Sequence, residues 1–160
     1  MASLSGNRYV LHMRAGYCMD EERYLLRDVT QLPQVHDGRL AGLDVTGGTL
    51  ALHIDDLHEP NAPSGSCDMV FEGFDDVYSD VNLLVTRFGV GMNVTGRLFY
   101  LDDLMVYMER RRLPDLRVLE ILARCEKVMI GCWLSALDPE DRGSPAWLSI
   151  CARSLRYLWS

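Results

Sequence analysis

The sequence has almost no lysine and lacks the short motifs that mark common enzyme sites. Lys127 is its only lysine, the net charge is −7 at pH 7, and no long basic run offsets it. Such a chain is not expected to bind a nucleic-acid backbone. No G-x-S-x-G elbow, G-x-G-x-x-G loop or C-x-x-C pair occurs. The sequence therefore offers no marked nucleophilic serine, phosphate-binding loop or paired-cysteine site.

Long apolar stretches are also missing. No segment is apolar for long enough to cross a bilayer. The N-terminal residues MASLSGNRYVLHMRAG have no apolar stretch of signal-peptide length. The five cysteines are odd in number, which does not suit a disulfide framework. We therefore expect a cytoplasmic protein without a membrane partner, whose reduced thiols act mostly as small core residues.

The composition fits one folded domain over residues 1–160. Hydrophobic residues make up 48% of the sequence and charged residues 24%, which are ordinary values for a globular protein. A chain of this length buries roughly 68–70% of the surface that its unfolded form exposes. It can therefore build a core without disulfides or metals.

The clearest local pattern is a β-hairpin around Gly47-Gly48. Alternating segments over 39–46 and 49–55 flank this pair, and both glycines can adopt the positive φ of a tight hairpin turn. The alternation in the first segment is imperfect, so a β-bulge is expected near Gly42. Further strands are predicted over residues 8–14, 67–74, 80–87, 117–124, 128–134 and 147–153.

Two segments show features of helices. Apolar residues recur at helical spacing over 101–112, and Pro114 forbids continuation. A short helix is expected near 20–29, where acidic residues suit a first turn. A strand over 23–29 competes with that helix, because the same residues also alternate.

The class expected from these elements is α+β. Residues 115–137 permit either one long helix or two strands, and their β-branched and aromatic residues favour strands. We expect a single domain dominated by a meander-like antiparallel β-sheet. The main helix near 101–112 lies between two groups of strands, with a possible short helix near 20–29.

The stretch LHIDDLH, residues 52–58, raises the question of a metal site. His53, Asp55 and His58 are residue types that bind metals, and His36 lies one predicted strand away. No distant segment supplies an obvious further ligand, and polar residues at a strand end are common. We favour a solvated strand end and assign no catalytic residue, metal or cofactor. A metal-dependent hydrolase using His36, His53, Asp55 and His58 is the alternative.

Acidic residues gather around the hairpin and the strand that follows it. They are Asp55, Asp56, Glu72, Asp75, Asp76 and Asp80. A solvated rim is the first explanation, and a docking surface for a basic protein partner is the second. A hydrolase with paired carboxylates would need one acid with a raised pKa in a cleft. These six residues are the candidate partner-binding set.

Aromatic residues near the C-terminus suggest a third role. Trp133 and Trp147 are expected in the core. Tyr157-Leu158-Trp159 is expected to pack on the sheet, and the alternative is an exposed apolar patch that forms a homodimer.

Four short segments combine a His-Asp step with alternating apolar residues. They are VHDGRL (35–40), the pattern of Leu50, Leu52 and Ile54, VFEGF (70–74) and LSICA (148–152). This combination resembles small bacterial immunity proteins of polymorphic toxin systems. The resemblance covers roughly residues 34–84 and 147–156, and residues 89–137 fall outside it.

The resemblance implies a non-catalytic protein that binds a toxin and blocks it. It also implies that His36-Asp37 is structural, with Asp37 satisfying backbone donors at a turn. The acidic composition suits a basic nuclease as the target. The expected function is a cytoplasmic protein-binding module, an immunity-like inhibitor of a toxin. The alternatives are the metal-dependent hydrolase and a homo-oligomeric structural protein.

Overall fold

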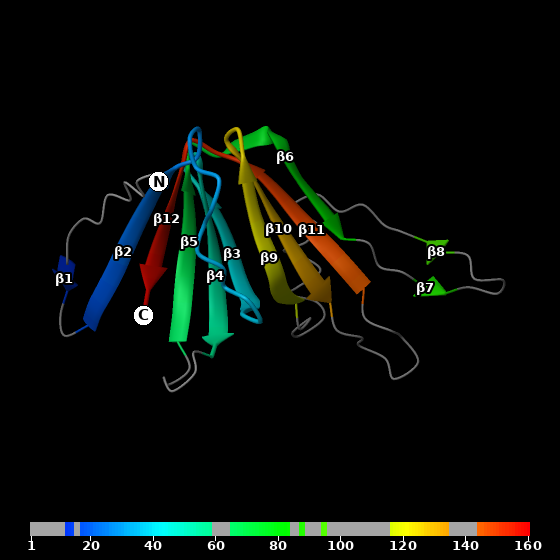
Figure 1. The fold of residues 1–160 in the computed structure, drawn as a ribbon, viewed down its shortest axis with the longest axis horizontal. Helices are drawn as coiled ribbons and strands as arrows, with labels where there is room; N and C mark the ends of the chain where they lie inside the picture. The colour runs from blue at the N-terminus through cyan, green and yellow to red at the C-terminus, as the bar shows by residue number, and fades with distance from the viewer. Residues whose placement is uncertain are drawn as a thin grey trace, which may run out of the picture.

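The computed structural model describes residues 12–14, 17–58, 65–83, 87–88, 94–95, 116–134 and 144–160. Ten strands form one antiparallel sheet in the order β1-β2-β12-β5-β4-β3-β9-β10-β11-β6, and β7 pairs with β8 separately (Figure 1). The strands are β1 (His12–Arg14), β2 (Tyr17–Leu25), β3 (Arg39–Thr46), β4 (Thr49–Leu57), β5 (Gly65–Glu72), β6 (Asp75–Leu83), β7 (Arg87–Phe88), β8 (Val94–Thr95), β9 (Leu116–Arg124), β10 (Lys127–Leu134), β11 (Ser144–Cys151) and β12 (Ser154–Trp159).

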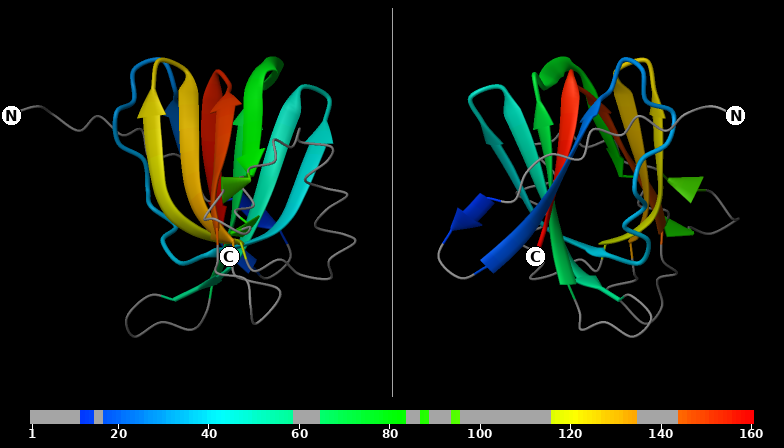
Figure 2. Two further views of the ribbon diagram at one scale, coloured as in Figure 1. Left: turned by 90° about the vertical axis from the view of Figure 1, so that its right-hand side faces the viewer. Right: turned by 60° about the vertical axis from the view of Figure 1, so that its left-hand side comes forward.

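The sheet bends into two walls that face each other (Figure 2). The first wall consists of β2, β12, β5, β4 and β3, and the second of β9, β10, β11 and β6. The walls meet where β3 pairs with β9, and this ladder has a single Cα partner pair, Arg39 with Arg117. The backbone of Val118 extends the junction, because it accepts a bond from Asp37 N–H and donates one to Gly38 O. The junction is therefore short compared with the other ladders.

The chain also passes between the walls at two adjacent corners. β5 leads into β6 through Gly73-Phe74, and β11 leads into β12 through Ala152-Arg153. The corners touch, since Arg153 N–H donates to Glu72 O at 3.0 Å. Thus β12 pairs with β5 in the first wall while β11 pairs with β6 in the second.

The core lies between the walls. Alternate residues of the strands point inward, and the connection from β2 to β3 adds Leu26, Leu32 and Val35. Tyr157 of β12 is fully buried, and its hydroxyl donates to Pro33 O at 3.0 Å, which holds this connection against the first wall. Strand residues in the core include Leu50, Leu52, Ile54, Cys67, Met69, Phe71, Val118, Ile121, Val128, Ile130, Leu148 and Ile150.

The predicted hairpin is confirmed. β3 and β4 flank Gly47 and Gly48, whose φ angles are 58° and 73°. The register shifts between Leu40 and Gly42, so the predicted bulge is also present. Residues 115–137 contain β9 and β10 rather than a helix, as the residue types favoured.

The α+β class is wrong. Residues 20–29 do not form a helix: β2 runs from Tyr17 to Leu25, and its residues 20–25 pair with β12. The acids of this segment alternate across a strand instead of capping a helix, because β12 offers a long-range partner that local propensity does not reveal. The segment 101–112 lies outside the described residues. The residues that the structure describes form strands and connections without a helix. No helix there has the length and hydropathy needed to cross a membrane.

Candidate functional site

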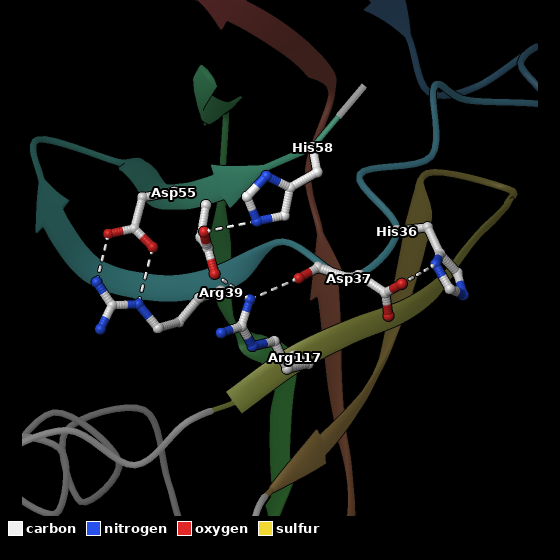
Figure 3. A network of polar contacts seen from close by, with 7 residues as sticks. His36, Asp37, Arg39, Asp55, His58 and Arg117 are labelled. Atoms are coloured by element: carbon white, nitrogen blue, oxygen red, sulfur yellow. Dashed lines mark hydrogen bonds and ion pairs between the residues drawn. The ribbon is translucent and has the colours of Figure 1, made fainter. Parts of the chain in front are cut away.

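Residues 52–57 form the last part of β4, and His58 follows them, close to where the two walls meet (Figure 3). Asp55 is the Cα partner of Arg39 on β3, and the two side chains join through two hydrogen bonds. Arg39 Nε donates to Asp55 Oδ1 at 2.8 Å and Nη2 donates to Oδ2 at 2.6 Å. This is the fork-to-fork geometry that gives arginine–carboxylate pairs their strength and direction.

The Asp56 side chain contacts Arg117 and not Arg39, because the backbone changes conformation at Asp56. Its φ is 56°, and the β4–β5 register shifts between Ile54 and Leu57. This left-handed residue is the mark of a bulge, a conformation that aspartate tolerates better than most residues. Asp56 Oδ2 then accepts a bond from Arg117 Nη1 at 2.6 Å, and Oδ1 lies 2.9 Å from His58 Nε2.

The His-Asp step before β3 belongs to the same network. Arg117 Nη1 also donates to the carbonyl oxygen of Asp37 at 3.0 Å. The Asp37 carboxylate lies 3.1 Å from His36 Nδ1, whereas its backbone N–H makes the contact with β9. A Cβ atom on Gly38 would overlap Ile54 Cγ2 and lie 2.7 Å from Leu57 Cδ2. Only glycine therefore lets this turn lie flat against β4.

The electrostatics of this cluster favour structure over chemistry. The hydrogen bonds from Arg39 lower the pKa of Asp55, and those from Arg117 lower the pKa of Asp56. A general acid needs the opposite shift. The two arginines are also the Cα partners at the junction of the walls. We therefore define Arg39–Asp55 and Arg117–Asp56 as the junction clamp, because it links β4 to both sides of the short ladder.

The histidines of the alternative metal set do not converge. His53 lies opposite Asp68 of β5, with Nδ1 2.5 Å from Oδ1, on the outer face of the first wall. His58 contacts Asp56 and His36 contacts Asp37. Among the described residues, no three His, Cys, Asp or Glu side chains are placed to share one ion.

The cysteines beside these groups are inward-facing. Cys67 is the Cα partner of Ile54, not of His53, and it points into the core. Burial raises the pKa of Cys67 and of Cys132 to about 12. A thiol must ionise to act as a nucleophile. Neither of these two thiols is suited to that role.

The structure divides the six predicted partner-binding acids between two ends of the sheet. Asp55 lies near one end of β4, and Glu72 pairs with Thr49 at the other, so they are roughly 20 Å apart at about 3.3 Å per residue. Glu72 contacts Arg23, Arg156 and Ser154 at 2.9–3.1 Å.

The acids after Glu72 have separate surroundings. Asp75 Oδ1 accepts the backbone N–H of Val77 at 3.0 Å, as a turn-forming aspartate does. Asp76 is exposed. Asp80 lies on β6, but its side chain is not among those described.

The second wall presents an apolar outer face that the sequence did not reveal. Trp133 and Trp147, expected in the core, are 41% and 37% exposed. Their strand neighbours Cys132, Ala146 and Leu148 are buried, so both indoles point outward. The face is made of Leu119 and Leu122 of β9, Met129 and Trp133 of β10, and Trp147 of β11. We call these five residues the apolar face.

The outer face of the first wall is polar by contrast. Its side chains form ion pairs across neighbouring strands, which is how a solvated sheet face is usually built. The pairs are Arg23–Glu72, Arg156–Glu21, Arg156–Glu72 and His53–Asp68. One continuous sheet therefore has a solvated outer side on one wall and an apolar outer side on the other.

Sequence reasoning missed both arginines of the clamp and the apolar face. Arg117 lies 61 residues from Asp56, so no local pattern connects them. The available signal was the alternation over 117–124 and 128–134, which sets Leu122 opposite in direction to Ile121, and Met129 opposite to Val128 and Ile130. Comparison of the chain with protein-family models, curated proteins and solved structures found no match.

Proposed function

We propose that this protein is a non-catalytic protein-binding module that docks its partner on the apolar face. The observation that carries the proposal is the contrast between the two walls. The outer positions of β2, β12, β5 and β4 carry four ion pairs, whereas those of β9, β10 and β11 include two tryptophans, a methionine and two leucines. Contiguous exposed apolar side chains of this kind mark interaction surfaces.

The residue types on this face match those of protein interfaces. Aromatic residues and methionine are enriched where proteins bind each other, and tryptophan is among the residues enriched at positions that dominate binding energy. Met129 is 42% exposed and Leu122 is 54% exposed, and the two are Cα partners across β9 and β10. Leu119 is also exposed on β9, at 42%.

At a finer level, we propose that the partner is a toxin domain and that the protein acts as a cytoplasmic, immunity-like inhibitor. The resemblance of residues 34–84 and 147–156 to immunity proteins supports this class. The net charge of −7 supports a basic toxin domain, because opposite net charges accelerate encounter. The bound inhibitor would act by covering the toxin, without turning over a substrate.

The geometry gives less support to the hydrolase. Asp55 and Asp56 each form an ion pair with an arginine. Of the nearby histidines, His53 contacts Asp68 and His58 contacts Asp56, so the two do not share one carboxylate. In the homo-oligomer alternative, the same apolar face binds a second copy of this chain. The experiment below separates it from the inhibitor.

The test starts with the protein encoded beside this gene. If it is a toxin, co-expression with this protein restores growth, and the purified pair forms a stable complex. Met129→Glu places a charge in the middle of the apolar face and is expected to weaken that complex by more than about tenfold. Leu25→Glu is the matched control, because Leu25 is 63% exposed on β2 of the first wall. It is expected to leave binding unchanged.

Two results contradict the proposal. One is a neighbouring gene product that neither arrests growth nor binds this protein. The other is equal binding by Met129→Glu and the unaltered protein. Light scattering on the isolated protein tests the oligomer: a dimer that Met129→Glu converts to a monomer assigns the face to a second copy.

A further inference from the structure

One carboxylate lies beside the apolar face, and the strand register places it across Gly131 from Trp147. Glu120 of β9 is the Cα partner of Gly131 on β10, and Gly131 is in turn the partner of Trp147 on β11. Trp133 follows two positions after Gly131 on the same strand, so it points to the same side of the sheet. The row from Glu120 to Trp147 therefore crosses the centre of the face.

Gly131 leaves a notch in this row because it has no side chain. A Cβ atom there would lie 3.1 Å from Glu120 Cγ and 3.5 Å from Oε1. The Glu120 side chain therefore leans across the glycine, toward the side on which Trp147 lies. Neighbouring strands are about 4.8 Å apart. The carboxylate thus sits within reach of any group that rests against the exposed indoles.

Glu120 differs from the carboxylates of the first wall that form ion pairs, because no cation contacts it among the described residues. Glu21, Glu72, Asp55 and Asp56 each contact an arginine. Within the described part of the chain, Glu120 makes neither a hydrogen bond nor an ion pair, and its side chain is exposed. An unpaired carboxylate close to exposed indoles is an arrangement that attracts an organic cation.

We propose that Glu120, Trp133 and Trp147 bind an arginine side chain of the protein partner over Gly131. The inference rests on the proposed docking function of the apolar face and adds the chemistry that it recognises. A guanidinium group is planar, so it can stack on an indole while its N–H groups donate to a carboxylate. A lysine ammonium has no planar group to stack, and it is a compact and strongly hydrated charge, so it is expected to bind more weakly in this geometry.

Among the described residues, neither arginine of β9 forms an ion pair with Glu120. Arg117 is directed to Asp56 and to the Asp37 carbonyl oxygen. Arg124 lies four residues from Glu120 on β9, roughly 13 Å away at about 3.3 Å per residue. That separation exceeds the Debye length of about 8 Å at physiological ionic strength. The charge of Arg124 is therefore largely screened from a guanidinium that binds over Gly131.

The experiment uses the full chain and three short peptides. Acetyl-Gly-Arg-Gly-amide is the probe, the citrulline peptide is its uncharged isostere, and the lysine peptide carries the same charge without the planar group. The chain has three tryptophans, so the indole N–H signals in NMR spectra report Trp133, Trp147 and the distant Trp159 separately. The arginine peptide is expected to shift Trp133 and Trp147 in a saturable way and to leave Trp159 unmoved.

Variants complete the test. Glu120→Gln keeps the shape of the side chain and is expected to weaken peptide binding roughly three- to tenfold. Glu126→Gln, an exposed glutamate in the turn between β9 and β10, is the matched control and is expected to change nothing. Equal shifts with citrulline or lysine would overturn the proposal, as would unchanged binding by Glu120→Gln.

The outcome is separable from that of the proposed function. If the arginine peptide fails while Met129→Glu still abolishes toxin binding, the docking face is retained and the arginine site is wrong. If the peptide binds as expected and the neighbouring protein does not, the cation site is real and the toxin assignment is wrong.

Discussion

Asp55→Asn tests whether the junction clamp holds the two walls together. The substitution keeps the size of the side chain and removes its charge. Wild-type Asp55 accepts two bonds from Arg39, at 2.8 and 2.6 Å. Asparagine retains one acceptor oxygen, so at best one neutral bond to the guanidinium survives. The lost hydrogen bond lies at the junction of the walls, because Arg39 and Arg117 form the only Cα partner pair between β3 and β9.

The magnitude follows from how far the pair is removed from water. The side chains of Arg39 and Asp55 are 29% and 27% exposed, so they lie between surface and interior. Exposed ion pairs contribute about 0.2–1 kcal/mol, and hydrogen bonds to charged groups about 1.5–3 kcal/mol. We expect Asp55→Asn to lower the free energy of unfolding by about 1–2 kcal/mol at pH 7.

The effect should depend on pH with a definite sign. Arg39 holds the pKa of Asp55 below its unfolded value of about 3.9. A lowered folded-state pKa gives stability that is present above the unfolded pKa and lost as pH falls through the folded one. The difference between wild type and Asp55→Asn should therefore be constant from pH 7 to about pH 5 and should shrink below about pH 4.

Urea unfolding at pH 7, 5 and 3 measures this difference, and hydrogen exchange locates it. The amides of Asp37 and Val118, which bond across the junction, should exchange faster in the variant. Asp44→Asn, an exposed aspartate on β3, is the matched control and should change stability by less than about 0.5 kcal/mol. A loss below that value for Asp55→Asn, or a loss that persists undiminished at pH 3, would refute the role of the clamp.

Three further predictions concern a close backbone contact, a buried hydrogen bond and the exposure of two thiols. Gly38→Ala forces a Cβ into β4 and should cost about 1–3 kcal/mol in urea unfolding, whereas Gly42→Ala, whose Cβ would meet only His53 Cβ at 3.5 Å, should be nearly neutral. Tyr157→Phe removes the bond to the Pro33 carbonyl and should cost about 0.5–1.5 kcal/mol, seen as a lower Tm in calorimetry. Iodoacetamide at pH 8 should label exposed Cys125 and spare buried Cys132, whose pKa is about 12; equal labelling in the mass spectrum would be contrary evidence.

Local pattern predicted the strands well where a turn and an alternation agree. Gly47-Gly48 has both features, and the hairpin was found with its bulge. The segment 20–29 shows the limit, because its acids suit a helix start and its alternation suits a strand. What decides is pairing with β12, and Glu21 and Arg156 are 135 residues apart in sequence. Such a partner cannot be read from one short window.

The candidate site failed to be predicted for the same physical reason. Asp55 and Asp56 look like metal ligands in isolation, and the arginines that occupy them come from other strands. Trp133 and Trp147 were placed in the core because large aromatic residues are usually buried. Alternation puts them outside, next to buried Cys132 and Leu148. For these two tryptophans, the alternation of the strand predicted the exposed position correctly and the hydrophobicity of the side chain did not.

The position of β12 has a consequence for how the chain acquires its structure during synthesis. β12 is inserted between β2 and β5, so β2 meets its main partner only after more than a hundred further residues have been made. At 5–20 residues per second, the 135 residues that separate Glu21 from Arg156 take roughly 7–27 s. Until β12 has been made, the edges of β2 and β5 that it joins lack their partner strand, and the first wall is incomplete.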